Sequence, residues 1–95
     1  MAPRSVERLL AAITSHDVGV RVAAYLLDLP GSMRDGLPSV RLPMAKQEVA
    51  AYLGTTPETL SRRLAALSAS GVIELHGRRD VTILDIDALE RVAAP

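Results

Sequence analysis

The chain has 95 residues, enough for one small domain, and its 48% apolar fraction includes no Phe, no Trp and only two Tyr. Because it has no cysteine, the sequence excludes disulfides, thiolate zinc sites and iron–sulfur ligation. Eleven basic and eleven acidic side chains cancel, so the total charge does not indicate the basic domain that is typical of nucleic-acid binding.

The charges are nevertheless sorted along the chain. Residues 41–80 carry six basic and four acidic side chains, whereas residues 81–95 carry one basic and three acidic ones. The basic excess therefore falls on one part of the chain, which also contains the two-helix motif predicted below.

No targeting or membrane signal is evident. The N-terminal residues lack the basic-then-apolar pattern of a secretion signal, and no apolar run approaches the ~20 residues that a membrane span needs. The absence of cysteine fits a reducing compartment. We therefore expect a cytoplasmic protein without a membrane partner.

The first part of the chain predicts scaffold elements. Apolar side chains at helical spacing predict a helix over residues 4–13 and a second one over residues 17–29. Residues 30–39, rich in Pro, Gly and Ser, predict a loop, and residues 40–42 predict a short extended segment. We expect no chemistry from this part.

Two helices joined by a short turn are predicted next. The first runs from Ala45 to Leu53, with Gly54 at the position of a helix C′ residue. The second covers residues 57–70, with Pro57 at its first position and a threonine as its N-cap. A three-residue turn that begins with glycine is typical of a helix-turn-helix.

After this motif the pattern switches from helical to alternating. Residues 72–76 and 80–84 predict two strands that flank a turn with two arginines at 77–79, and residues 85–92 predict a short closing helix. The predicted fold is mainly α with a small β-hairpin wing, the winged helix-turn-helix.

The second helix of the motif has two different faces. At about 100° per residue, three leucines share the side that must face the core: Leu60, Leu64 and Leu67. Glu58, Ser61, Arg62 and Ala65 gather on the opposite side. Guanine O6 and N7 accept an Arg fork, cytosine N4 donates to a carboxylate, and Ser serves either role. We therefore expect Glu58, Ser61 and Arg62 to read bases, whereas Arg63, nearer the flank, is a surface or phosphate-binding residue.

Polar and basic side chains around this helix suit phosphate contacts. They lie at the start of the first helix, at the entry of the second helix and around the hairpin turn: Lys46, Gln47, Thr56, Thr59, His76, Arg78 and Arg79. Such contacts fix position and supply salt-dependent affinity, and they do not select a sequence.

Glu58 has a competing structural role. If Thr55 is the N-cap, Thr55 and Glu58 form a capping box, and the carboxylate serves the end of the helix. Pro57 at the first helical position favours Thr56 as the cap instead, which leaves Glu58 for the bases.

Other suggestive residues are explained structurally. Ser61, His76 and Asp80 are the residue types of a hydrolytic triad, but no Gly-rich elbow accompanies them. Asp85 and Asp87 are typical of a helix cap, and no set of residues has the ligand count of a metal site. We therefore predict neither an enzyme nor a cofactor in this chain.

Several stretches form a specific pattern: Gln47-Glu48-Val49-Ala50, Leu53-Gly54, Pro57-Glu58-Thr59-Leu60-Ser61-Arg62, Leu64, Leu67 and Gly71-Val72-Ile73. His76-Gly77-Arg78 in the hairpin and residues 21–29 continue it. From about Asp17 onward, the chain resembles the DNA-binding domain of the Crp/Fnr family of bacterial transcription regulators.

This resemblance implies double-stranded DNA as the partner, with half-sites close to TTGAT arranged as an inverted repeat and read by a homodimer. Arg62 would contact the guanine, Glu58 the cytosine paired with it or an adjacent donor, and Ser61 a thymine. Ser61 is similar to the Fnr-like branch, since the Crp-like branch has Gly there. Residues 43–47 and 57–59 resemble the branch that responds to nitric oxide. RNA polymerase would be a further partner of the full-length protein.

The chain departs from the family in lacking the N-terminal effector-binding β-barrel and most of the long dimerisation helix. We expect residues 1–14 to be a remnant of that helix or a linker, and residues 15–95 to be the winged helix-turn-helix domain. The alternative function is a winged helix used for protein–protein contact, which the neutral total charge favours. The polar face opposite the leucines favours DNA, because a protein-binding face is more often aromatic or aliphatic.

Overall fold

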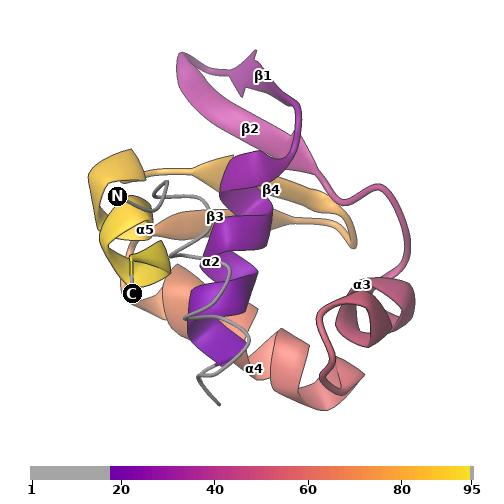
Figure 1. Cartoon of the computed structure of the whole chain (residues 1–95). Helices are drawn as coiled ribbons and strands as arrows, with labels where there is room; N and C mark the ends of the chain where they lie inside the picture. Colours follow the sequence, from indigo (N-terminus) through magenta and orange to yellow (C-terminus); the bar gives the residue numbers. More distant parts are fainter. Residues whose placement is uncertain (1–17, 95) are drawn as a thin grey trace, which may run out of the picture.

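The computed structural model describes residues 18–94, which contain four helices and four strands (Figure 1). In chain order these are α2 (Val18–Asp28), β1 (Gly31–Arg34), β2 (Leu37–Arg41), α3 (Lys46–Tyr52), α4 (Pro57–Ala69), β3 (Ile73–His76), β4 (Asp80–Ile83) and α5 (Ile86–Ala93). The winged helix-turn-helix fold is thereby confirmed. The helix predicted over residues 4–13 and the segment 1–14 lie outside the described residues.

The prediction of a loop over residues 30–39 is wrong, because this segment forms the β1–β2 hairpin. Arg34 pairs with Leu37 across a two-residue turn, Asp35-Gly36. Both turn residues have positive φ, 52° and 80°. Such a turn matches the twist of the flanking strands, and Asp-Gly is one of its preferred sequences. The extended segment predicted over residues 40–42 is the end of β2, with Leu42 just beyond it.

The four strands form one antiparallel sheet in the order β1-β2-β4-β3. The predicted wing, β3 and β4, is therefore the outer half of a larger sheet. Val81 of β4 is paired with Val40 on one side and with Leu75 on the other. In Figure 1 the turn of this wing lies on the same side of the molecule as α3, and α5 lies on the other side.

The core lies between the sheet and helices α2, α4 and α5. The three leucines predicted to face inward from α4 are buried, and Leu60 and Leu64 are each 1% exposed. They belong to one cluster with Leu26 of α2, Ile73 of β3 and Leu89 of α5. Burying one such side chain contributes about 1.5–3 kcal/mol. None of the helices between residues 18 and 94 has the length and apolar character that crossing a lipid bilayer requires.

The two tyrosines of the sequence form an aromatic contact between α2 and α3. The ring centroids of Tyr25 and Tyr52 lie 5.7 Å apart at an interplanar angle of 53°. Burial, and then the neighbouring Tyr52, raise the pKa of Tyr25. Tyr52 itself is 71% exposed. Although α3 has only two buried side chains, Val49 and Ala50, this ring contact adds a further attachment to the scaffold.

The two faces of α4 predict opposite effects of substitution on stability. Leu64→Ala should lower the free energy of unfolding by about 2–5 kcal/mol, because it leaves a cavity in the core. Ser61→Ala, one turn away on the exposed face, should change it by less than about 0.5 kcal/mol. Urea denaturation followed by circular dichroism measures both values. Equal losses would contradict the assignment of the faces.

Candidate nucleic-acid interface

The turn between α3 and α4 is fixed by backbone hydrogen bonds. The Gly54 N–H donates to the Ala51 carbonyl at 3.1 Å, and the Thr55 N–H donates to the Ala50 carbonyl at 2.9 Å. This pair of bonds is the Schellman motif, which needs a left-handed residue at the position of Gly54, where φ is 73°. The chain therefore leaves α3 in a defined direction and starts α4 three residues later.

Thr56 is the N-cap of α4, as the position of Pro57 predicted. Its hydroxyl accepts from the Thr59 N–H at 3.2 Å, and the two threonine hydroxyl oxygens lie 3.0 Å apart. The two hydroxyls carry two protons, of which the bond between them uses one. The other is available to an outside acceptor such as a phosphate oxygen.

Because Thr56 is the cap, no capping box engages Glu58 through Thr55. Glu58, Ser61 and Arg62 are all exposed on α4, at positions i, i+3 and i+4, which places them on one side of the helix. Ala65 continues this side and is exposed too. Among residues 18–94, neither the carboxylate nor the guanidinium has an ion-pair partner. The helix thus presents an acceptor, a hydroxyl and a five-donor fork to the outside.

Three of the predicted phosphate contacts meet in one place. Lys46 at the start of α3, with Ala45 before it, lines a hollow of about 240 Å³ together with Arg78 and Arg79 from the turn of the wing. We refer to this as the basic hollow. Arg78 is exposed, and Lys46 and Arg79 are half-buried. Gln47, the next residue of α3, is exposed beside it.

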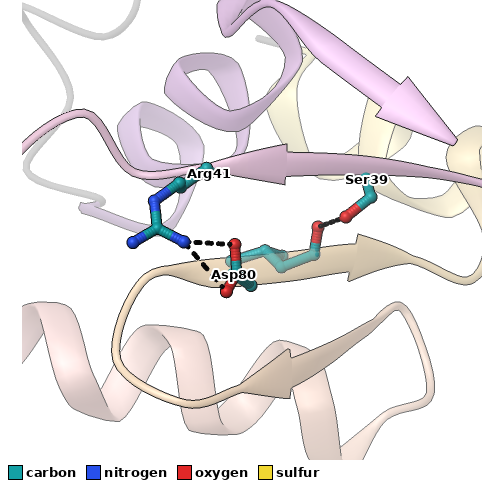
Figure 2. A network of polar contacts seen from close by, with 4 residues as sticks. Ser39, Arg41 and Asp80 are labelled. Carbon is teal, nitrogen blue, oxygen red and sulfur yellow. Dashed lines mark hydrogen bonds and ion pairs between the residues drawn. The ribbon is translucent and has the colours of Figure 1, made fainter. Parts of the chain in front are cut away.

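Two links between the C-terminal end of β2 and the start of β4, including the residue next to each strand, hold the parts of the basic hollow together. The Leu42 N–H donates to the Arg79 carbonyl at 2.8 Å. The Arg41 Nη1 lies 3.2 and 3.3 Å from the two carboxylate oxygens of Asp80, as Figure 2 shows. Deeper in the same strand pair, the Ser39 hydroxyl donates to the Val81 carbonyl at 3.3 Å. These contacts fix the wing turn relative to the segment that enters α3.

His76 lies within β3 and not in the turn itself, and it faces Asp80 across the strand pair. Its Nε2 is 2.7 Å from the Glu74 Oε1, and its side chain is 28% exposed. The ring is therefore already beside a carboxylate, unlike the neighbouring arginines. The Arg41–Asp80 pair was not predicted from the sequence, because the extended segment at residues 40–42 was not paired with the strand that begins at Asp80.

Other kinds of chemistry find little support in the described part of the chain. Between residues 18 and 94, no three His, Asp or Glu side chains lie close enough together to hold a metal ion. Asp85, considered above with Asp87, is the N-cap of α5 and accepts from the Ala88 N–H at 3.0 Å. The exposed face of α4 and the basic hollow remain as candidate features for recognition.

Comparisons with known proteins agree with this geometry. The model of the Crp-like helix-turn-helix domain matches residues 20–92. A probable transcriptional regulator, flp, of Lacticaseibacillus casei is 38% identical over 90 residues, covering 95% of this chain and 40% of that protein. The transcriptional activator protein FnrL of Cereibacter sphaeroides is 34% identical over 88 residues, covering 93% of this chain and 32% of that protein.

A solved structure gives the same result. A transcriptional regulator of the CRP family from Thermus thermophilus has a TM-score of 0.75 and 29% identity, over 93% of this chain and 46% of that one. The chain therefore spans less than half the length of these three proteins.

The cap of α4 can be tested by substitution. Thr56→Ala should lower the free energy of unfolding by about 1 kcal/mol, because the Thr59 N–H loses its acceptor. Thr55→Ala is the matched control, since its backbone and not its hydroxyl joins the turn, and it should cost less than about 0.5 kcal/mol. Thermal or urea unfolding measures the difference. A larger loss for the Thr55 variant would move the cap to that residue.

Proposed function

The chain belongs to the family of Crp-like helix-turn-helix domains, and we propose that it binds double-stranded DNA sequence-specifically, as the DNA-binding part of a bacterial transcription regulator. The observation that carries this proposal is the exposed set Glu58, Ser61 and Arg62 on α4, opposite the buried leucines. A helix with these groups on its outer face matches the donors and acceptors of the major groove. The names of the two relatives, a transcriptional regulator and a transcriptional activator, support the same function.

The assignment of bases rests on the resemblance to the Fnr-like branch, which the relative FnrL supports. Residues 57–70 act as the recognition helix on a half-site close to TTGAT. Arg62 contacts the guanine with its fork, Glu58 accepts from the paired cytosine or an adjacent donor, and Ser61 contacts a thymine. The response to nitric oxide stays a prediction.

The neutral total charge is compatible with this function because the charge is unevenly distributed. Lys46, Arg78 and Arg79 gather at the basic hollow. Asp87 and Glu90 belong to α5, which lies on the other side of the molecule from α3 (Figure 1). A phosphate backbone docked along α3, α4 and the wing turn therefore meets the basic part of the surface, and the acidic part faces away.

The predicted phosphate contacts position α4 over the bases. Gln47 lies at the start of α3 and Thr56 and Thr59 lie at the start of α4, whereas Lys46, Arg78 and Arg79 line the basic hollow. His76 contributes only if it leaves Glu74. None of these contacts distinguishes one base from another, so sequence choice rests on the exposed face of α4.

The rest of the regulator follows from the family. We propose that the full-length protein acts as a homodimer on an inverted repeat, contacts RNA polymerase, and senses its effector through a separate domain. Because its proposed partner is DNA, such a protein acts in the bacterial cytoplasm. DNA binding requires neither catalysis nor a cofactor in this domain.

A titration tests the proposed function directly. Fluorescence anisotropy of a labelled duplex at low salt should show that a TTGAT inverted repeat binds at least about 10-fold more tightly than a scrambled duplex of equal composition, since each mismatched base pair costs about 1–3 kcal/mol. Equal, salt-sensitive binding to both duplexes would keep DNA binding and remove this half-site. No binding to either duplex would favour the protein-interaction alternative.

Arg62 is expected to carry the strongest discrimination. Arg62→Ala should weaken binding to the inverted repeat by about 1–3 kcal/mol and flatten the preference for guanine at one position of each half-site. Arg63→Ala removes the same charge from the flank of the helix and serves as the control, with base preference unchanged. Titration of duplexes substituted at each position measures this. If the Arg62→Ala variant kept the base preference of the parent, that result would contradict the role of Arg62 in reading bases.

A further inference from the structure

We propose that the basic hollow holds a single DNA phosphate, shared by the start of α3 and the turn of the wing. This inference rests on the proposed function and adds that these two elements bind as one unit. The hollow is lined by three cationic side chains from segments more than 30 residues apart: Lys46, Arg78 and Arg79. The fourth lining residue is Ala45. Its volume of about 240 Å³ leaves room for a phosphate group.

No carboxylate of the described residues forms an ion pair with the cations of the hollow. Asp80, next to the turn, lies within 3.2 Å of Arg41. Glu74 lies 2.7 Å from the ring of His76. Across residues 18–94, no carboxylate lies within ion-pair distance of Lys46, Arg78 or Arg79. Like charges gathered in this way repel one another until an anion neutralises them.

The hollow is formed before any ligand arrives. The Leu42 N–H holds the Arg79 carbonyl at 2.8 Å, and Leu42 is only 2% exposed. Ala45 and Lys46 follow three and four residues later, so the start of α3 cannot move far from the wing turn. Binding an anion there requires little ordering of the backbone, which favours one shared contact over two adjustable ones.

A shared phosphate and two separate phosphates differ in the dependence of affinity on salt. The slope of log K against log salt changes by about 0.9 for each phosphate neutralised on duplex DNA. If Lys46 and Arg78 share one phosphate, the double variant Lys46→Ala/Arg78→Ala should lower the slope by at most about one unit in total. If each neutralises its own phosphate, the slope should fall by about two units.

The experiment titrates the parent chain, both single variants and the double variant with a labelled duplex at several salt concentrations. Arg91→Ala, an equal loss of charge on α5, is the control and should leave the slope unchanged. We expect the two single losses of affinity not to multiply, as they would for independent sites. Once one cation has been removed, the second substitution should weaken binding by a smaller factor than it does in the parent. Multiplicative losses with a two-unit change would overturn the shared phosphate.

Neutral methylphosphonates, placed one at a time in the inverted repeat, locate the contact. A methylphosphonate at one position in each half-site should weaken binding of the parent. On that duplex, each single variant should bind with the same affinity as the parent. Loss of sensitivity at two different positions would overturn the proposal while leaving DNA binding intact. If the parent binds no duplex at any salt concentration, the proposed function fails, and the shared phosphate fails with it.

Discussion

Strand β4 is hydrogen-bonded on both sides, and the geometry of the interface depends on this double pairing. One edge of β4 joins β3 to form the wing, and the other joins β2, which leads within a few residues into α3. A wing paired only with itself would be free to change its angle, since an isolated two-stranded hairpin is marginally stable. Here the wing turn is held to the helix-turn-helix through a short, buried connection at Leu42.

Helix α4 connects this frame to recognition. Its leucines are part of the core that also contains Leu26 and Leu89, so the direction of its exposed face is set by packing. The Thr56 cap and the Gly54 turn then set where the helix begins. A polar set of side chains can therefore be presented in a defined orientation by a domain with no excess of positive charge, because orientation and local charge matter at the contact more than the total.

Features encoded locally were predictable from the sequence. Pro57 and the i, i+4, i+7 leucines define α4, and the alternation around residues 77–79 defines the wing, because each signal lies within one element. The β1–β2 hairpin was missed because Pro and Gly content outweighed Asp35-Gly36, a hairpin signal in its own right. The Arg41–Asp80 pair and the basic hollow join residues more than 30 positions apart. Such contacts follow from strand order, which composition and periodicity do not reveal.

The tyrosine contact between α2 and α3 has a spectroscopic consequence. The chain contains two tyrosines and no tryptophan, and both tyrosine rings lie in that single contact, 5.7 Å apart. All of the intrinsic protein fluorescence therefore originates where the first helix of the helix-turn-helix meets the scaffold. A change in its intensity reports on the position of α3 relative to α2, without any label and without substitution of a residue at the DNA-binding face.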